Sequence, residues 1–482
     1  MKIPERGLDR DALFARMEAY RQDDMPWRDG RTWAYIYDPG PEAEEVVKRA
    51  YSMYLGENGL DPTVFPSTLR LENEIVAMGR SHLGGDDEVV GSFTSGGTES
   101  CLLAVKTARD RARALHPEID APEMVLPSTA HAAFHKAGHY FGVKPVTTDI
   151  DPVTFRADPE AMRRAITPRT VLLVASAVSY AHGVVDPIPE IGRIALERDV
   201  LLHVDGCIGA FLLPYFRRLG GRFPEFDFRV PGVTSMSMDL HKYAFAAKGA
   251  SLILHRNKSL RRHQIYTCAD WTGYSIVNPT VQSTKSAGPL AGAWAALNFI
   301  GDDGYLEMAR KMKDATERVC AGIAAIPGLR VLGRPDMNLV AFTSDDVSVF
   351  HVIDEMKLCR WYVQPQLAYG SSKENIHLSI NPAAHRWVDD FLADLRICVE
   401  RAAALPSGEI AARVREAVER LDPARFDEAT FFQLIELAGL AGTALPGRMA
   451  PINEIMNSLP VAFREKVLTE YANQLFHPAS GL

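Results

Sequence analysis

Short apolar runs alternate with helical stretches between about residues 70 and 310, and this alternation constrains the fold more than any other feature of the sequence. Helical stretches such as 99–115 and 188–199 separate the runs. Strand–helix alternation of this kind predicts an α/β fold, with a mostly parallel sheet covered by helices. The four clearest apolar runs read as buried strands and are MVLP (124–127), TVLLVAS (170–176), LLHVD (201–205) and SLILH (251–255).

The same pattern divides the chain into four regions. Residues 1–70 form an N-terminal arm, and residues 71–310 form the large domain. A long helix at 303–326 then leads into residues 311–405, which mix strands with helices and predict a small α+β domain. Residues 406–482 are helical and interrupted by proline, with no chemistry apparent, so we expect a helical cover or an oligomer contact.

Composition excludes several classes of protein. A net charge of -8 and a pI of about 6.0 argue against a nucleic-acid partner. The six cysteines form no C-x-x-C pair, so we expect no metal site and interpret them as reduced thiols of a cytoplasmic protein. No apolar stretch reaches the roughly 20 residues of a membrane helix. We therefore expect no integral membrane segment, and a lipid substrate would have to be met from the water side.

The segment SMSMDLHKYAFAAKGASLILH (235–255) carries the most chemistry, because a His-Lys pair lies between a serine-rich run and a loop of small residues. A lysine that forms a Schiff base must reach a carbonyl carbon with a neutral amine. Burial and nearby cations favour that neutral form. Lys242 is the candidate, although by itself it is one lysine among many.

Three further signals are weak individually. Asp205 ends an apolar strand, where a carboxylate faces the ligand crevice of an open α/β sheet and could pair with a pyridinium nitrogen. It could equally be a turn aspartate. Gly97 and Thr98 begin a helix whose N–H groups suit a phosphate, or they form a plain helix cap. His131 could stack on a pyridine ring, but an isolated histidine is more often structural or exposed.

Order and spacing make these signals specific. A phosphate turn, a stacking histidine, a strand-end aspartate and then Ser-x-Ser-x-Asp-x-His-Lys resemble the enzymes of fold type I that depend on pyridoxal 5'-phosphate (PLP), in the group II decarboxylase branch. Within that branch, the chain resembles the sphingosine-1-phosphate lyase family from about Trp33 to about residue 400. The similar segments are FTSGGTES, AHAAFHKAGHYFG, HGVVDPIPEI, HVDGCIGAFLLP, FDFRVPGVTSMSMDLHKYAFAAKGASLIL and ADWTGYSIVNPT.

This resemblance implies a PLP-dependent transferase fold: a mostly parallel seven-stranded sheet with helices on both faces, and a small α+β C-terminal domain. It implies that Lys242 holds PLP as a Schiff base, that Asp205 pairs with the ring nitrogen and that His131 stacks on the ring. The other residues it places near the cofactor are Gly97, Thr98, His182 and His241, and those it places on the substrate side are Tyr37, Asn58, Asp61, Lys248 and Lys285, with Tyr37 also among the catalytic residues.

The substrate side departs from the family pattern at three places. The family's Asn-Pro-Leu-His reads Asn58-Gly59-Leu60-Asp61 here, and an Asp61 carboxylate pointing into the site would repel a phosphate. The family's Gly-Ser-Arg reads Ser283-Thr284-Lys285, which keeps a charge without the guanidinium fork. The family's Gly-Gly-x-Tyr reads Gly273-Tyr274-Ser275-Ile276 here, so its tyrosine is either displaced or lost. We therefore expect intact cofactor binding and an altered substrate side, which fits either a relative with a different amine substrate or ordinary sequence drift in a true lyase.

The expected activity is a carbon–carbon lyase that splits a phosphorylated long-chain base, such as sphingosine 1-phosphate, into a fatty aldehyde and phosphoethanolamine. An amino-acid decarboxylase on the same scaffold is the alternative, and a catalytically inactive PLP-fold protein that binds a lipid phosphate is a third hypothesis. The resemblance also implies a homodimer with shared active sites, so that Tyr37 and the segment 280–288 would act from the neighbouring chain.

Overall fold

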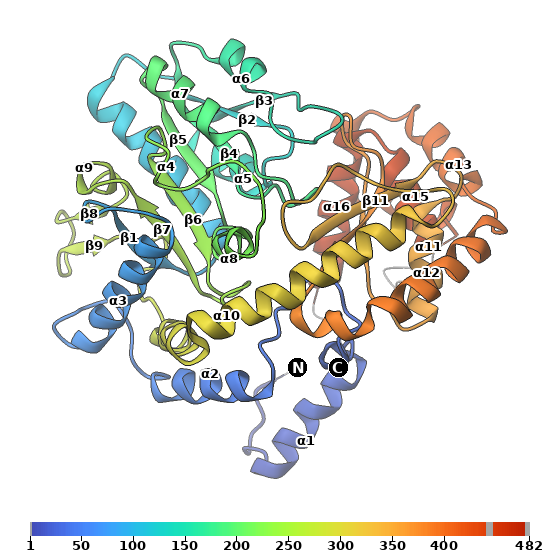
Figure 1. Ribbon diagram of the computed structural model, residues 1–482, viewed down its shortest axis with the longest axis horizontal. Coiled ribbons are helices and arrows are strands. Elements are labelled where there is room, and N and C mark those ends of the chain that lie inside the picture. Colours follow the sequence, from blue (N-terminus) through green and yellow to red (C-terminus); the bar gives the residue numbers. More distant parts are fainter. Residues whose placement is uncertain (1, 440–446, 478–482) are drawn as a thin grey trace.

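The computed structural model describes residues 2–439 and 447–477. Met1 of the predicted arm, and residues 440–446 and 478–482 of the predicted tail, lie outside the described residues. The described chain forms a large α/β domain, a small α+β domain and a group of C-terminal helices (Figure 1).

A seven-stranded sheet forms the centre of the large domain, with the strand order β1-β7-β6-β5-β4-β2-β3. Strand β7 runs antiparallel to β1 and β6, and the remaining neighbours pair in parallel. The predicted mostly parallel seven-stranded sheet is therefore confirmed. Its strands are β1 (Val90–Thr94), β2 (Glu123–Pro127), β3 (Lys144–Thr148), β4 (Thr170–Ser176), β5 (Leu201–Asp205), β6 (Ser235–Asp239) and β7 (Ser251–His255).

Helices cover this sheet because its central strands are apolar on both faces. Every residue of β4 is buried, which suits a parallel strand between two helical layers. Helices α4 and α7 both pack on β4 and β5 (Figure 1). The helices of this domain are α3 (Pro66–His82), α4 (Gly97–Leu115), α5 (Ala133–Phe141), α6 (Pro159–Ala165), α7 (Ile188–Arg198), α8 (Leu213–Arg218) and α9 (Lys258–Arg261), and a hairpin of β8 (Tyr266–Cys268) and β9 (Ile276–Asn278) follows.

One long helix, α10 (Ala287–Ala324), runs from the large domain into the small domain and crosses the predicted boundary at residue 310 (Figure 1). It bends at Gly301, whose positive φ of 65° interrupts the helical conformation. The arm helix α2 (Pro41–Met53) packs along α10, and α1 (Arg10–Tyr20) precedes it.

The small domain has an antiparallel sheet in the order β10-β11-β13-β12, with its own apolar core. Trp33 of the predicted arm belongs to this core and stacks on Phe391, with ring centroids 4.1 Å apart. The arm therefore contributes to both domains, because Trp33 lies in the small-domain core while Ala43 and Val47 of α2 lie in the core of the large domain. The elements are β10 (Leu329–Val331), β11 (Leu339–Ser344), α11 (Val349–Leu358), β12 (Gln364–Gln366), β13 (Asn375–Ser379) and α12 (Val388–Ala403).

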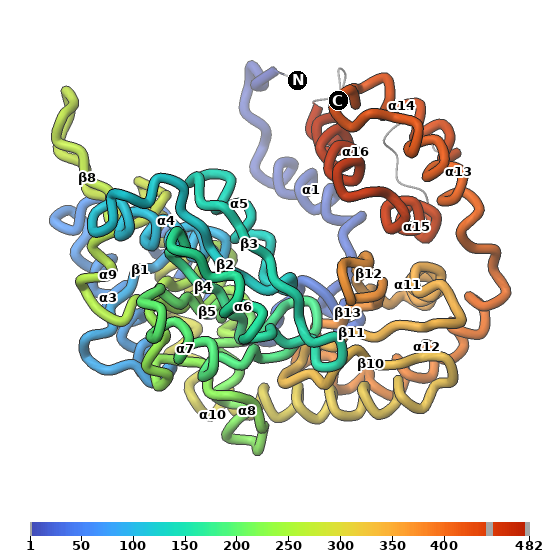
Figure 2. The backbone as a smooth tube through the Cα atoms, turned by 90° about the horizontal axis from the view of Figure 1, so that it is seen from above, coloured from blue at the N-terminus to red at the C-terminus, as the bar shows by residue number. Residues whose placement is uncertain are grey.

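The C-terminal helices form a unit beside the small domain, with a small core of their own (Figure 2). Helix α15 packs on α11 and so joins this unit to the small domain. None of the helices in the described part of the chain is both long and apolar enough to cross a membrane. The helices of this unit are α13 (Glu409–Val418), α14 (Glu428–Leu437), α15 (Ala450–Ser458) and α16 (Val461–Leu475).

Candidate active site

A cavity of about 350 Å³ opens where strands β4, β5 and β6 end and helix α4 begins. Parallel strands bring their carboxyl ends to one edge of a sheet, which is where ligands bind in open α/β folds. Most of the predicted cofactor residues line this cavity: Gly97, Thr98, His131, Asp205, His241 and Lys242.

The first turn of α4 forms one wall of this cavity. A Cβ atom at Gly97 would lie 2.7 Å from Asp239 Oδ2 and 2.8 Å from Cys207 Sγ, so only glycine allows this close approach. Glu99, which also lines the cavity, fixes the turn, because its carboxylate accepts hydrogen bonds from the backbone N–H groups of Ser95 (2.6 Å) and Val281 (2.7 Å). The unbonded N–H groups at this helix start can hold a phosphate.

Lys242 lies just beyond β6, and its Nζ is 3.0 Å from Asp239 Oδ2. Burial lowers the pKa of Lys242, but the Asp239 carboxylate outweighs it, so the pKa lies well above its ordinary value. This corrects the expectation that nearby cations keep the amine neutral: in this arrangement an anion holds it as an ammonium. The other carboxylate oxygen, Asp239 Oδ1, is buried and has no hydrogen-bond partner among the described residues.

Asp205 ends β5 and is 6% exposed. Its Oδ1 accepts a hydrogen bond from the Cys207 N–H (3.0 Å), which fixes the carboxylate at the cavity wall. Cys207 Sγ lies 3.9 Å from Cys101 Sγ, and both thiols line the same cavity.

Two histidines of the cavity are held by backbone groups. His131 precedes α5, and its Nδ1 accepts a hydrogen bond from the Ala133 N–H (3.1 Å), which orients an exposed ring at the cavity wall. His241 Nδ1 accepts from the Ala250 N–H (3.2 Å). Burial lowers the pKa of His241 to about 4, against the attraction of Asp239, so this imidazole is neutral at neutral pH.

His182 lies outside this cavity. It stacks on Phe155, with ring centroids 4.1 Å apart, and its Nε2 is 3.0 Å from Ser372 Oγ. It lines an adjoining cavity of about 310 Å³, which shares His131 and Tyr180 with the first cavity. Burial lowers the pKa of His182 to about 4. The structure therefore places His182 next to the cofactor cavity and not in its wall.

Tyr37 and Lys248 meet each other near the Schiff-base candidate. Lys248 Nζ lies 4.4 Å from the centre of the Tyr37 ring and donates a hydrogen bond to the His241 carbonyl (3.0 Å). Burial and repulsion by Lys242 lower the pKa of Lys248 to about 8. Burial raises the pKa of Tyr37 to about 12, so the phenol stays protonated. Tyr37 also packs on Tyr243 of its own chain.

The other predicted substrate residues point elsewhere. Asn58 Oδ1 accepts from the Leu60 N–H (3.1 Å), and exposed Asp61 accepts from the backbone and hydroxyl of Thr63 (2.8 and 2.6 Å). The side chains of Asn58 and Asp61 therefore each stabilise the local turn in which they lie. Lys285 is 6% exposed, and its Nζ is 2.6 Å from Glu72 Oε2. The Lys285 ammonium is therefore paired with a carboxylate of the same chain.

Sequence reasoning missed Asp239, Glu99 and Tyr180. Asp239 lies three residues before Lys242, and that spacing was the available signal, since it allows an ion pair across one turn. Tyr180 follows β4 at the same sheet edge as Asp205, and its hydroxyl donates to Gln364 Oε1 (2.6 Å). Glu99 had a local signal, because it is the third residue of α4 and accepts a hydrogen bond from the Ser95 N–H just before the helix. Its contact to Val281, which joins segments far apart in the sequence, had none.

The site suits PLP in its own geometry. The glycine at the helix start leaves room for a phosphate, and the partly buried Lys242 amine and the strand-end Asp205 carboxylate line one cavity. Asp239 Oδ1 is buried there without a hydrogen-bond partner among the described residues. Fold and site together define a PLP-dependent enzyme. The family model of the pyridoxal-dependent decarboxylase conserved domain matches residues 39–345, and a model described as the pyridoxal-dependent enzyme C-terminal putative HTH domain matches residues 412–474.

Similar proteins narrow this class. The chain is 39% identical to the sphingosine-1-phosphate lyase of Arabidopsis thaliana over 412 residues, which cover 84% of this chain and 74% of that protein. It is 36% identical to the Dictyostelium discoideum sphingosine-1-phosphate lyase over 405 residues, which cover 84% and 76% of the two chains. The chain belongs to the sphingosine-1-phosphate lyase family, and its cofactor is PLP.

Solved structures agree with this assignment. A sphingosine-1-phosphate lyase from Burkholderia pseudomallei superposes with a TM-score of 0.80 at 36% identity, covering 91% of this chain and 96% of that one. A glutamate decarboxylase from Lactobacillus brevis reaches a TM-score of 0.74 at 18% identity, covering 85% and 96%. The second likeness concerns the fold, and it confirms the predicted PLP-dependent transferase fold.

Proposed function

We propose that this chain is a PLP-dependent carbon–carbon lyase that cleaves a phosphorylated long-chain base, such as sphingosine 1-phosphate, into a fatty aldehyde and phosphoethanolamine. The observation that carries the proposal is the cavity in which Lys242, Asp205 and the α4 turn meet, in a chain of this family. Bound PLP supplies an electron-withdrawing ring that stabilises negative charge on the carbon next to the substrate amine.

The residues of the cavity divide the work of holding the cofactor. The N–H groups around Gly97 and Thr98 would bind its phosphate, and the Asp205 carboxylate would accept a hydrogen bond from its protonated ring nitrogen. His131, which the Ala133 N–H orients, would lie against the ring. Lys242 would hold the cofactor through its amine, and its ammonium, 3.0 Å from Asp239 Oδ2, would first have to give up a proton.

Lys248 and Tyr37 form the substrate side. An ammonium with a pKa of about 8 is largely charged at neutral pH and attracts the phosphate of the substrate. Tyr37, protonated because its pKa is about 12, donates a hydrogen bond and does not act as the resting base. Asp61 faces its own turn, so it does not oppose a phosphate from within the cavity. Burial also raises the pKa of Tyr180, the tyrosine that lines the cavity, so the base that takes the substrate's hydroxyl proton is a histidine or the substrate phosphate itself.

Substrate assays test this proposal against the decarboxylase alternative. The enzyme is incubated with sphingosine 1-phosphate, with sphingosine and with a panel of amino acids, while aldehyde and carbon dioxide are measured. We expect aldehyde from the phosphorylated base, little from sphingosine, and no carbon dioxide. Carbon dioxide from an amino acid without any aldehyde would establish the decarboxylase. A protein that binds the lipid phosphate but lacks cofactor absorbance would support the inactive binder.

We also propose that the protein is a cytoplasmic homodimer. We expect it to bind no nucleic acid and to have no integral membrane segment. All six cysteines are free thiols, as expected for a reducing compartment. Residues 412–474 carry nine acidic and seven basic side chains, a balance that does not favour nucleic acid. Light scattering on the purified enzyme tests the dimer, and a monomeric mass at full activity would contradict it.

A further inference from the structure

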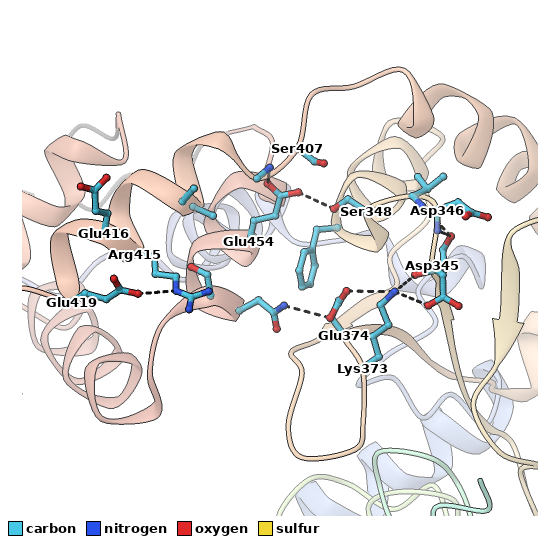
Figure 3. Close-up of a pocket in the computed structure, with 18 residues that line it drawn as sticks. Asp345, Asp346, Ser348, Lys373, Glu374, Ser407, Arg415, Glu416, Glu419 and Glu454 are labelled. Atoms are coloured by element: carbon cyan, nitrogen blue, oxygen red, sulfur yellow. Dashed lines mark hydrogen bonds and ion pairs between the residues drawn. The ribbon is translucent and has the colours of Figure 1, made fainter. Parts of the chain in front are cut away.

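The loop 367–374, between β12 and β13, separates two cavities. On one side, Leu367, Tyr369 and Ser372 line the cavity of about 310 Å³ that adjoins the cofactor cavity. On the other side, Lys373 and Glu374 line a cavity of about 650 Å³ between the small domain and the C-terminal helices (Figure 3). A side chain that holds this loop on the side of the 650 Å³ cavity therefore also fixes the wall of the 310 Å³ cavity.

The loop touches the active-site region directly. Ser372 Oγ lies 3.0 Å from His182 Nε2, and His182 lines the cavity that shares His131 and Tyr180 with the cofactor site. The loop is short and turned by a backbone pair between Tyr369 and Ser372 (2.9 and 3.0 Å). A shift of the loop would therefore move Ser372 and change the shape of the space next to the cofactor.

A single side chain of the C-terminal helices bridges both ends of the loop. Asn457 lies on α15, and its Oδ1 accepts a hydrogen bond from the Ala368 N–H (2.7 Å). Its Nδ2 donates to Glu374 Oε2 at a longer 3.5 Å. The Asn457 carboxamide thus binds a backbone N–H near the start of the loop and a side-chain carboxylate at its end.

Helix α15 is a firm support for this bridge, because the small domain satisfies its helix start. Asp354 accepts hydrogen bonds from the N–H groups of Met449 (2.9 Å) and Ala450 (2.8 Å), and this carboxylate is 3% exposed. Glu454 accepts from the Ser348 hydroxyl (2.8 Å), as Figure 3 shows. Helix α15 is therefore anchored to the small domain through Asp354 and through Ser348.

We propose that the C-terminal helical unit is a positioning element of the active site. Asn457 is the residue through which this unit holds the 367–374 loop against the cavity of about 310 Å³ beside the cofactor site. Its role is indirect, since Asn457 contacts the loop and not the cavity. This inference rests on the proposed function only for the identity of the substrate. The order of the loop itself does not depend on which molecule is cleaved.

Two measurements on the PLP-loaded enzyme test the proposal. Asn457→Ala removes both contacts to the loop, so hydrogen–deuterium exchange in 367–374 should rise. KM for sphingosine 1-phosphate should rise by about fivefold, the effect of one lost hydrogen bond, with kcat changed by less than about twofold. Asn453→Ala is the matched control, because Asn453 lies one turn earlier on α15 and, among the described residues, the side-chain hydrogen bonds from α15 to the loop come from Asn457. It should leave exchange and KM unchanged.

A paired substitution keeps the test decisive if Asn457→Ala unfolds. Asn457→Asp retains the acceptor for Ala368 but places a carboxylate beside Glu374, so KM should rise; adding Glu374→Gln restores a donor and should return KM toward the original value. Unchanged loop exchange in Asn457→Ala, or equal effects of Asn453→Ala, would overturn the proposal. If no variant releases aldehyde but loop exchange still separates Asn457→Ala from Asn453→Ala, the proposed function fails while the positioning role stands.

Discussion

The cofactor end and the predicted substrate end of the site differ in how the fold places their residues. Asp205 and Lys242 follow neighbouring strands of one sheet, and Gly97 begins a helix at the same edge, so topology alone brings them into one cavity. Asp61 and Lys285 lie on connecting segments whose side chains turn to other partners. Residues at strand ends are placed by the sheet, whereas loop residues depend on local contacts that can redirect them.

The largest effect should come from the cofactor end. Lys242→Ala removes the amine that holds the cofactor, and kcat should fall by about three orders of magnitude or more. Lys242→Arg is the control, because it keeps a cation beside Asp239 and so separates loss of the amine from loss of the ion pair. Substantial turnover in either variant would place the chemistry on another lysine.

Two lysines of the predicted substrate side should behave oppositely. Lys285→Met leaves Glu72 without its buried partner, which should lower the free energy of unfolding by about 3 kcal/mol without changing KM. Lys248→Met should raise KM for the phosphorylated substrate and leave the melting temperature nearly unchanged. Thermal melts and steady-state kinetics measure both quantities. A raised KM in Lys285→Met at an unchanged melting temperature would return Lys285 to the substrate.

The charge of Lys248 gives the substrate end a pH dependence. Its pKa of about 8 means that the ammonium, present below that pH, is lost as the pH rises through it. The value of kcat/KM, which reports the free enzyme, should therefore fall by up to about tenfold from pH 7 to pH 9. Lys248→Met should lower kcat/KM at neutral pH and remove this decline. A decline that persists in the variant would belong to another group.

The smallest effect should come from Asp61, although this position departs from the family pattern. Asp61→Asn keeps an Oδ1 acceptor for Thr63 on an exposed turn, so kcat and KM should both stay within about twofold of the original values. Asp61→Ala, which removes the turn contacts, separates a turn effect from a charge effect. A clear drop in KM for Asp61→Asn would show that its charge does oppose the substrate phosphate.

These contrasts also show what the sequence could predict. The parallel sheet followed from apolar runs such as 170–176, because a strand buried on both faces leaves a continuous apolar record. Trp33 could not be assigned to the small domain, since its partner Phe391 is more than 350 residues away. The ion pair of Lys285 with Glu72 likewise joins distant segments, and periodicity carries no information on such contacts.

The site was predictable to the same extent. Gly97, Asp205 and Lys242 were identified from their order along the chain, and the structure brings them together. His182 was predicted to lie near the cofactor, but in the structure it lines the adjoining cavity, because stacking on Phe155 turns its ring toward Ser372. Asp239 changes the ionisation expected for Lys242, and its effect depends on a 3.0 Å approach that spacing alone does not fix.

The most direct test of the central claim is to find which lysine holds the cofactor. The PLP-loaded enzyme is reduced with borohydride, digested and analysed by mass spectrometry, which detects the pyridoxyl phosphate as a permanent addition to a side-chain amine. We predict the addition on Lys242 and its loss in Lys242→Arg. Incorporation at Lys248, or at no lysine in an enzyme that still turns over, would contradict the site described for this chain.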